Sequence, residues 1–314
     1  MDSFDGDQNR PPPPREEHVR FAAGSGACAG TLTVPAEAQS APAVVLCAGF
    51  SGTQDTPAVR AAAASFAQAG YAALTFDYRG FGVSEGQPRQ LIDLGAQRAD
   101  IRGAFEFLQA DDRIDRDRIA LWGTSLGGGH VVVVAADLPD VAAVVAQVPF
   151  NGFPRRVEGR SGRDTARLLW AMLVDRARGV LRMSPKYIPA VGPSGSLAVM
   201  ASADAARTIE TLESETWRNQ VAPRVLFDMM AYHPDRAAAR LTAPLLTCLA
   251  TRDRESPEVS ARRIAEAASD ATLLTYPISH FEIYRPDVRW RVLADQIAFL
   301  NDRLRDGGQA SSTS

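Results

Sequence analysis

The stretch that decides the fold is RIALWGTSLGGG, residues 118–129. It contains the pattern G-x-S-x-G, with Gly123 and Gly127 two positions on either side of Ser125. An apolar strand-like run precedes the pattern and a helix-like run follows it, as the motif requires. Small residues are needed beside the serine because side chains there would collide with backbone where a strand turns sharply into a helix. The stretch therefore predicts that Ser125 is a nucleophile at a helix N-terminus.

Outward from this stretch, short runs rich in Val, Leu and Ala alternate with longer amphipathic segments. This α/β alternation is typical of a mostly parallel sheet with helices on both faces. We expect core strands at 43–48, 72–76, 119–122, 142–148, 244–250 and 272–276, and helices at 57–69, 91–110, 126–137, 256–268 and 287–305. An antiparallel hairpin near 18–22 and 31–34 is expected at the sheet edge.

The alternation stops over residues 151–235, where proline, glycine, arginine and isolated aromatic residues replace it. We interpret this segment as a mostly helical cap inserted after the sixth core strand. Its helical stretches are expected at 164–181 and 196–212. The insertion predicts that the cap lies over the sheet and shapes a pocket there.

The remaining residues divide into a core and two tails. A chain of 314 residues is long for one core and short for two, so we expect one core, 17–150 and 236–305, that carries the cap. Residues 1–16 are polar and rich in proline, and 306–314 are polar and small. Such compositions bury too little apolar surface to offset chain entropy, which predicts disordered tails.

Composition excludes several classes of protein. Hydrophobic residues make up 46% and charged residues 23%, as in globular proteins, and the net charge of −3 offers no basic field for nucleic acid. No apolar stretch reaches 18 residues and no secretory leader is apparent. We therefore expect a cytoplasmic protein without nucleic-acid or membrane partners. A homodimer is the default expectation, because two-fold dimers are the commonest oligomers.

Four histidines are candidates for the general base: His18, His130, His233 and His280. In sites of this type the chain order is serine, acid, histidine. His18 precedes the nucleophile, His130 lies on the helix that follows it, and His233 comes before the last two core strands. His280 lies in the loop after the final predicted strand, which predicts that it is the base.

Asp253 is the candidate for the acid that orients this histidine. It follows the predicted strand 244–250 by three residues, which places it at the carboxyl edge of the sheet with the nucleophile. Glu255 and Asp228 remain rival carboxylates. Asp253 fits the order and spacing of the triad best.

Two backbone N–H groups are expected to stabilise an oxyanion. Leu126 follows the nucleophile at the start of the helix, where N–H groups lack acceptors and favour negative charge. The second donor should come from the loop Gly49-Phe50-Ser51-Gly52, which follows the strand at 43–48. We assign it to the N–H of Phe50.

With these residues in place, the chain resembles the α/β-hydrolase superfamily from about His18 to Arg305. Residues 76–86, FDYRGFGVSEG, look like a loop in bacterial members that reads D-x-R-G-x-G-x-S, in which Asp77 and Arg79 would fix the loop. The branch that it is most similar to contains dienelactone-hydrolase-like and X-Pro-peptidase-like bacterial hydrolases and fungal polyketide acyltransferases. The run CAGF, 47–50, lacks the His-Gly pair of many lipases and esterases.

The resemblance implies a carboxylesterase-like enzyme that cleaves an ester or thioester of a small-molecule hydrophobic acyl substrate through an acyl-enzyme. Neither a cofactor nor a metal is expected, because no histidine pair or Cys/His cluster has ligand spacing. Substrate-binding residues are expected on the cap at Trp170, Tyr187, Trp217 and Met230. An acyltransferase or thioesterase of a biosynthetic pathway and a non-catalytic ligand-binding protein remain alternatives, because the fold alone does not decide between them.

Overall fold

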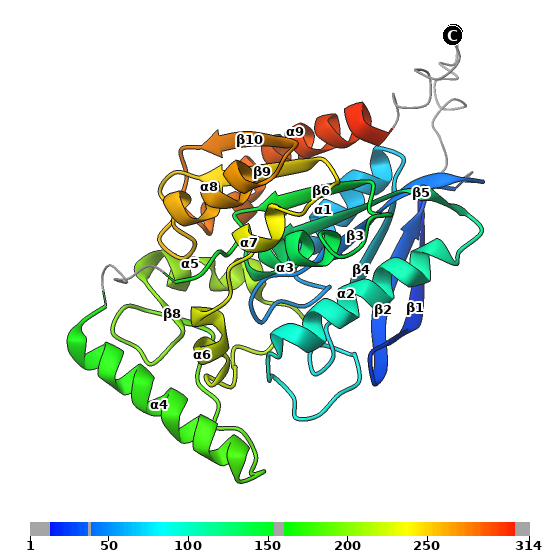
Figure 1. Ribbon diagram of the computed structural model, residues 1–314. Helices are drawn as coiled ribbons and strands as arrows, with labels where there is room; N and C mark the ends of the chain where they lie inside the picture. Colours follow the sequence, from blue (N-terminus) through cyan, green and yellow to red (C-terminus); the bar gives the residue numbers. More distant parts are fainter. Residues whose placement is uncertain (1–12, 37–38, 154–159, 305–314) are drawn as a thin grey trace, which may run out of the picture.

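An eight-stranded sheet forms the centre of the computed structural model, which describes residues 13–36, 39–153 and 160–304 (Figure 1). The strand order is β1-β2-β4-β3-β5-β6-β9-β10. Strands β3 to β10 of this sheet run parallel, whereas β1 and β2 pair antiparallel at one edge. Their bounds are β1 Arg15–Ala23, β2 Gly26–Val34, β3 Ala41–Cys47, β4 Ala72–Phe76, β5 Ile114–Thr124, β6 Ala143–Gln147, β9 Leu245–Ala250 and β10 Ala271–Tyr276. The predicted mostly parallel sheet is confirmed.

Helices cover both faces of this sheet (Figure 1). Helices α1 (Pro57–Gln68) and α9 (Pro286–Leu304) lie on one face, and α2 (Leu94–Gln109), α3 (Leu126–Ala135) and α8 (Glu258–Ala267) on the other. The central strands are therefore buried on both sides, which explains why they are continuously apolar rather than alternating. None of the helices within the described ranges is long and apolar enough to cross a membrane.

The first strand begins earlier than expected. Arg15 and Glu16, assigned to the N-terminal tail from sequence, belong to β1 and pair with the end of β2. The neighbouring Glu17 accepts two hydrogen bonds from Arg113, at 2.7 and 3.1 Å, which ties this edge strand to the start of β5. Because an edge strand of this kind is polar, its composition resembles that of a disordered tail, and the sequence alone did not separate the two. The other tail residues, 1–12 and 305–314, lie outside the described ranges.

The chain between β6 and β9 forms a separate layer, in which α4 lies farthest from the sheet (Figure 1). Its elements are α4 (Gly162–Val180), β7 (Val191–Gly192), β8 (Met200–Ala201), α5 (Ala203–Leu212), α6 (Val225–Met230) and α7 (Asp235–Ala238). The helix expected at 196–212 begins only at Ala203, because Ser202 caps it by accepting the N–H of Ala205 at 3.0 Å. Residues just before the cap pair with β7 instead.

Candidate active site

Ser125 occupies a strained turn between β5 and α3. Its φ and ψ are 55° and −119°, which is unusual for a residue with a side chain. A Cβ atom on Gly123 would lie 2.3 Å from the carbonyl oxygen of Gly127, and one on Gly127 would lie 2.4 Å from that of Ala48. Both positions therefore require glycine, as the sequence predicts. The turn places the hydroxyl of Ser125 at the N-terminus of α3.

The structure brings Ser125, His280 and Asp253 together from three separate loops. The Nε2 atom of His280 lies 3.1 Å from the Oγ atom of Ser125, and its Nδ1 atom lies 2.7 Å from an oxygen of Asp253. His280 is 2% exposed and Asp253 9% exposed. This chain of hydrogen bonds can pass the serine proton to the histidine while the carboxylate fixes the orientation of the ring.

Asp253 is itself held by backbone. Its Oδ1 atom accepts the N–H groups of Glu255 at 2.9 Å and Ser256 at 2.7 Å, which leaves Oδ2 for His280. The rival carboxylates make other contacts. Glu255 lines a cavity, and Asp228 is paired with Arg176 at 3.7 Å.

The surroundings of His280 make it a stronger base. Burial lowers its pKa, but the charge and hydrogen bond of Asp253 outweigh this effect, with smaller contributions from Glu255 and Asp204, so the pKa is raised overall. The adjacent Ser279 donates a hydrogen bond to Asp204 on α5 at 2.6 Å. The histidine loop is thus anchored to the inserted layer as well as to the core.

The loop that follows β3 lies directly against the nucleophile. A Cβ atom on Gly49 would lie 3.1 Å from the Cβ atom of Ser125. Phe50 and Leu126 line the same cavity as Ser125. Leu126 is the first residue of α3, so its N–H has no acceptor within the helix.

The same loop is held from its far end by Asp77. This carboxylate accepts the backbone N–H of Gln54 at 2.8 Å, its side-chain amide at 3.0 Å and the N–H of Val83 at 2.9 Å. Arg79 in turn is paired with Asp100. The loop at 76–86 is therefore a support for the loop that carries Phe50.

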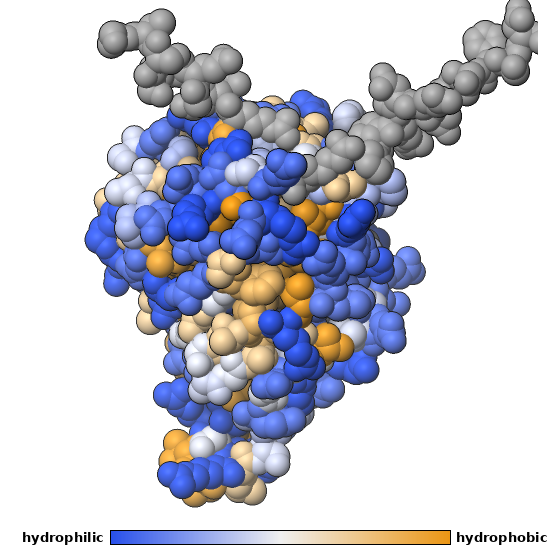
Figure 2. Space-filling model, turned by 90° about the vertical axis from the view of Figure 1, so that its right-hand side faces the viewer, coloured by the Kyte–Doolittle hydropathy of each residue, from blue (hydrophilic) through white to orange (hydrophobic). Residues whose placement is uncertain are grey.

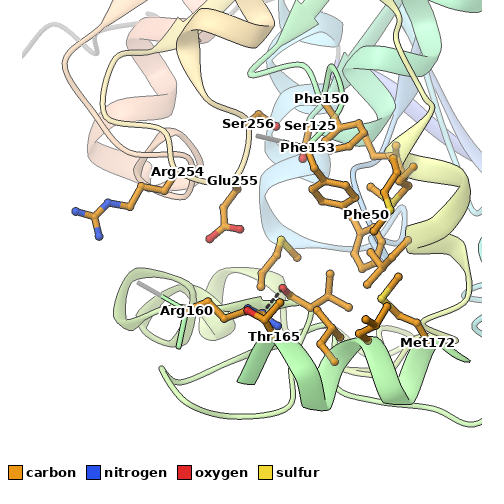
Figure 3. A pocket seen from close by; sticks show the side chains of 18 of the residues that line it. Phe50, Ser125, Phe150, Phe153, Arg160, Thr165, Met172, Arg254, Glu255 and Ser256 are labelled. Carbon is orange, nitrogen blue, oxygen red and sulfur yellow. Dashed lines mark hydrogen bonds between the residues drawn. The ribbon is translucent and has the colours of Figure 1, made fainter. Parts of the chain in front are cut away.

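A cavity of about 700 Å³ opens beside Ser125 (Figure 3). Its wall is mainly apolar and comes from the loops of the sheet and from α4, β8 and α6. The apolar lining residues are Phe50, Leu126, Phe150, Phe153, Leu168, Leu169, Met172, Val199, Met200, Leu226, Met229 and Met230. Such a wall suits an apolar group held next to the nucleophile.

Three charged residues are part of this otherwise apolar wall: Arg160, Arg254 and Glu255. Figure 3 shows Glu255 pointing into the cavity and Arg254 pointing away from it. Burial raises the pKa of Glu255. Arg160 donates two hydrogen bonds of 2.8 Å from Nη2 to the carbonyls of Ala198 and Val199. Its Nη1 atom is buried and meets no hydrogen-bond partner in the part of the chain that the structure describes.

The expected substrate-binding residues of the cap need correction. Met230 lines the cavity, but Trp170, Tyr187 and Trp217 are absent from its wall. Trp170 points outward from α4 and is 66% exposed. The hydroxyl of Tyr187 donates to the carbonyl of Arg89 at 2.6 Å. Trp217 is buried away from the cavity.

Sequence reasoning missed two groups that line the cavity. Phe150 and Phe153 follow β6, and residues 254–256 follow β9. Both groups come after the carboxyl ends of parallel strands, where ligands bind in open α/β sheets. That signal was available from the predicted strand ends. Arg160 had no comparable signal, because it lies in the irregular part of the insertion.

Residues 38–284 match the model of the family described as serine aminopeptidase, S33. The quorum-quenching protein AidA of Acinetobacter baumannii (strain MDR-ZJ06) is 36% identical over 285 residues, which are 90% of this chain and 93% of AidA. A polyketide transferase of Penicillium sp. is 30% identical over 161 residues, about half of each chain (51% and 52%). The crystal structure of the α/β hydrolase GrgF from Penicillium sp. sh18 has a TM-score of 0.77 at 23% identity, covering 93% of this chain and 99% of GrgF, and therefore shares the fold.

Proposed function

The chain belongs to the serine aminopeptidase S33 family of α/β hydrolases, and from this membership we propose that it hydrolyses an ester or thioester of a hydrophobic acyl group. Ser125 is the nucleophile, His280 the general base and Asp253 the acid that orients it. The observation that carries the proposal is the hydrogen-bond chain from Asp253 through His280 to Ser125, which ends at the wall of the apolar cavity.

Acylation begins when the Nε2 atom of His280 takes the proton of the Ser125 hydroxyl as its oxygen attacks the acyl carbonyl carbon. The carbonyl oxygen becomes an oxyanion, which accepts hydrogen bonds from the N–H groups of Phe50 and Leu126. His280 then gives its proton to the leaving oxygen or sulfur, and the bond between that atom and the carbonyl carbon breaks. The acyl group remains on Ser125 as an ester.

Deacylation repeats these steps with water. His280 takes a proton from a water molecule, whose oxygen attacks the ester carbonyl, and then returns the proton to the oxygen of Ser125. Asp253 holds the ring in the same orientation throughout and stabilises the positive charge that it carries in each tetrahedral state.

The cavity favours a substrate that combines an apolar chain with one polar group. The apolar wall accepts the chain, whereas the carboxylate of Glu255 and the guanidinium of Arg160 can each pair with a polar atom. Acylated lactones are cyclic esters that combine an apolar chain with a polar ring, so we include them among the candidate substrates.

Acyl transfer is the second candidate function. The similarity to a polyketide transferase over half of the chain favours it. Transfer uses the same acyl-enzyme, but an alcohol or amine replaces water as the attacking group. Mass analysis of the products, with and without an added acceptor alcohol, separates the two reactions.

Intact-mass measurement after incubation with a fluorophosphonate probe tests the nucleophile. We expect one adduct on the wild type, one on the control Ser260→Ala, whose serine lies on α8 outside the cavity, and none on Ser125→Ala. Labelling of Ser125→Ala to the same extent would refute the assignment. An unlabelled but folded wild type would instead favour the non-catalytic ligand-binding protein.

The substrate class is tested next with esters, thioesters and acylated lactones of increasing acyl length. We expect turnover to rise as the acyl chain fills the apolar wall. Equal turnover of acetyl and long-chain esters would contradict a hydrophobic acyl pocket.

A further inference from the structure

Apolar surface is concentrated on α4 and its surroundings. Eight of the eleven large apolar side chains that are exposed within the described ranges lie on α4, in the loop that follows it or on α6: Leu169, Trp170, Leu173, Val180, Leu181, Met183, Tyr187 and Met230. Figure 2 shows apolar surface at the lower tip of the molecule, where Figure 1 places the C-terminal end of α4. Monomeric proteins rarely expose apolar side chains in such a group.

The outward face of α4 has the spacing of a helix-pairing stripe. Five apolar residues that are all exposed follow one another at steps of four, three, four and three, and we name them the α4 seam: Ala166, Trp170, Leu173, Ala177 and Val180. The inward face, with Met172 and Asp175, is already buried in the inserted layer. Alternating steps of four and three keep one side of a helix facing a second helix along its whole length.

We propose that the α4 seam pairs antiparallel with the α4 seam of a second copy of this chain. The sizes along the seam fit this arrangement about a two-fold axis at Leu173. At 1.5 Å per residue, Trp170 lies about 4.5 Å from the axis in one direction and Ala177 about 6 Å in the other. Trp170 therefore meets the small side chain of the partner's Ala177. Ala166 and Val180 are matched in the same way.

The charges beside the seam also favour an antiparallel second copy. Arg163, Arg167 and Arg176 flank the apolar residues. In a parallel pair each arginine would face its own copy, and the ion pairs of Arg167 with Asp164 and of Arg176 with Asp228 would offset only part of this repulsion. In the antiparallel pair Arg176 lies opposite the partner's Trp170, where a guanidinium can rest on the indole ring. The other two lie opposite uncharged residues of the partner subunit.

The exposed apolar area is of the size that a dimer needs. A standard interface buries about 800 Å² from each partner. A large exposed side chain contributes on the order of 100 Å². The four on α4 therefore supply about half of the required area, and the three in the loop that follows α4 supply most of the rest.

The interface lies beside the cavity. Leu168 and Met172 of α4 line the cavity, and Leu169 both lines it and reaches the surface. A second copy on the outward face would therefore hold the cavity wall from behind.

Sedimentation velocity over a range of concentrations tests the association. We expect the wild type to sediment as a dimer of the 33.7 kDa chain and Leu173→Asp to sediment as a folded monomer. The matched control is Val259→Asp on α8, which makes the same change at another exposed apolar residue, outside the seam, and should remain dimeric. A wild type that stays monomeric at its highest soluble concentration overturns the proposal. A dimer that survives Leu173→Asp also overturns it.

Two further sets of variants test the register. Trp170→Ala and Ala177→Trp should each weaken the dimer at least tenfold, and the double variant should restore it because each large side chain again meets a small one. A double variant that dimerises no more tightly than the single variants overturns the antiparallel register.

Cross-linking tests the position of the two-fold axis. Leu173→Cys should form a disulfide-linked dimer on oxidation, whereas Val259→Cys should not. The native cysteines are buried and do not compete. Equal cross-linking of both variants overturns the axis.

Discussion

The Nδ1 atom of His280 lies 2.7 Å from the Oδ2 atom of Asp253, while the second oxygen of this carboxylate is occupied by two backbone N–H groups. Asp253→Asn preserves the shape of this contact but favours the wrong tautomer of the ring. We expect kcat to fall about 10⁴-fold with little change in KM. Steady-state kinetics with an activated ester measures both constants, and a loss below tenfold would contradict the role of Asp253.

The raised pKa of His280 sets the acidic limb of the pH profile. The ring must be neutral to accept the serine proton, so activity is lost as pH falls through a pKa above the usual value of about 6.5. Asp204→Asn removes one of the negative charges that raise this pKa. We expect the midpoint of kcat/KM against pH to move downward in this variant. An unchanged midpoint would rule out the contribution of Asp204.

Gly49→Ala tests the loop that carries Phe50. The added Cβ atom would lie 3.1 Å from both the Cβ atom of Ser125 and the carbonyl oxygen of Thr124, so the loop must shift by a few tenths of an ångström. We expect kcat to fall about 10- to 100-fold, because oxyanion donors act only at short range. Fluorophosphonate labelling should slow in parallel, while the thermal midpoint changes little. Full activity would show that the loop position does not matter.

Glu255→Gln tests the polar part of the cavity. The neutral amide is easier to bury than a carboxylate, so we expect KM to fall for purely apolar esters. For a substrate with a donor group that reaches Glu255, kcat/KM should drop about tenfold or more. Glu266→Gln is the matched control, because it makes the same change at an exposed residue of α8 outside the cavity wall. Identical changes in both variants would mean that the effect is one of general charge.

His130 should make the free energy of unfolding depend on pH, and it takes no part in catalysis. This residue is fully buried, with its Nδ1 atom 2.7 Å from the hydroxyl of Tyr232 and its Nε2 atom 3.1 Å from the Oε1 atom of Gln97. Burial lowers its pKa to about 3. The unfolded chain takes up a proton below about pH 6.5 and the folded chain does not, so this residue costs about 1.4 kcal/mol of stability per pH unit as pH falls toward 3.

Urea unfolding of the wild type and His130→Gln between these pH values isolates the effect. The variant has no group to protonate at this position, so its stability should fall less steeply than that of the wild type. Parallel curves would exclude His130 as the cause.

The core could be predicted from its apolar strands. The grouping of Ser125, His280 and Asp253 could be predicted because each of these residues lies just after a recognisable strand. Parallel strands end at one edge, so chain order alone placed the three side chains together. The inserted layer gave no such signal. Trp170 and Trp217 are both isolated aromatic residues of the insertion, and nothing in the sequence separates them. Trp170 is exposed and Trp217 is buried, because their environments depend on how short, irregular segments pack. For the same reason the sequence did not predict the position of Arg160 or the short strand β8.

The loop 253–256 joins two roles in four consecutive residues. Asp253 orients His280, while the three residues after it form part of the cavity wall and two of them hold Asp253 in place through their N–H groups. An insertion or deletion that reshaped this wall would therefore displace Asp253 and abolish activity, whatever its effect on substrate preference. New substrate preferences should evolve through α4 and β8 instead, and libraries that randomise those two elements should yield more active variants than libraries built on the loop.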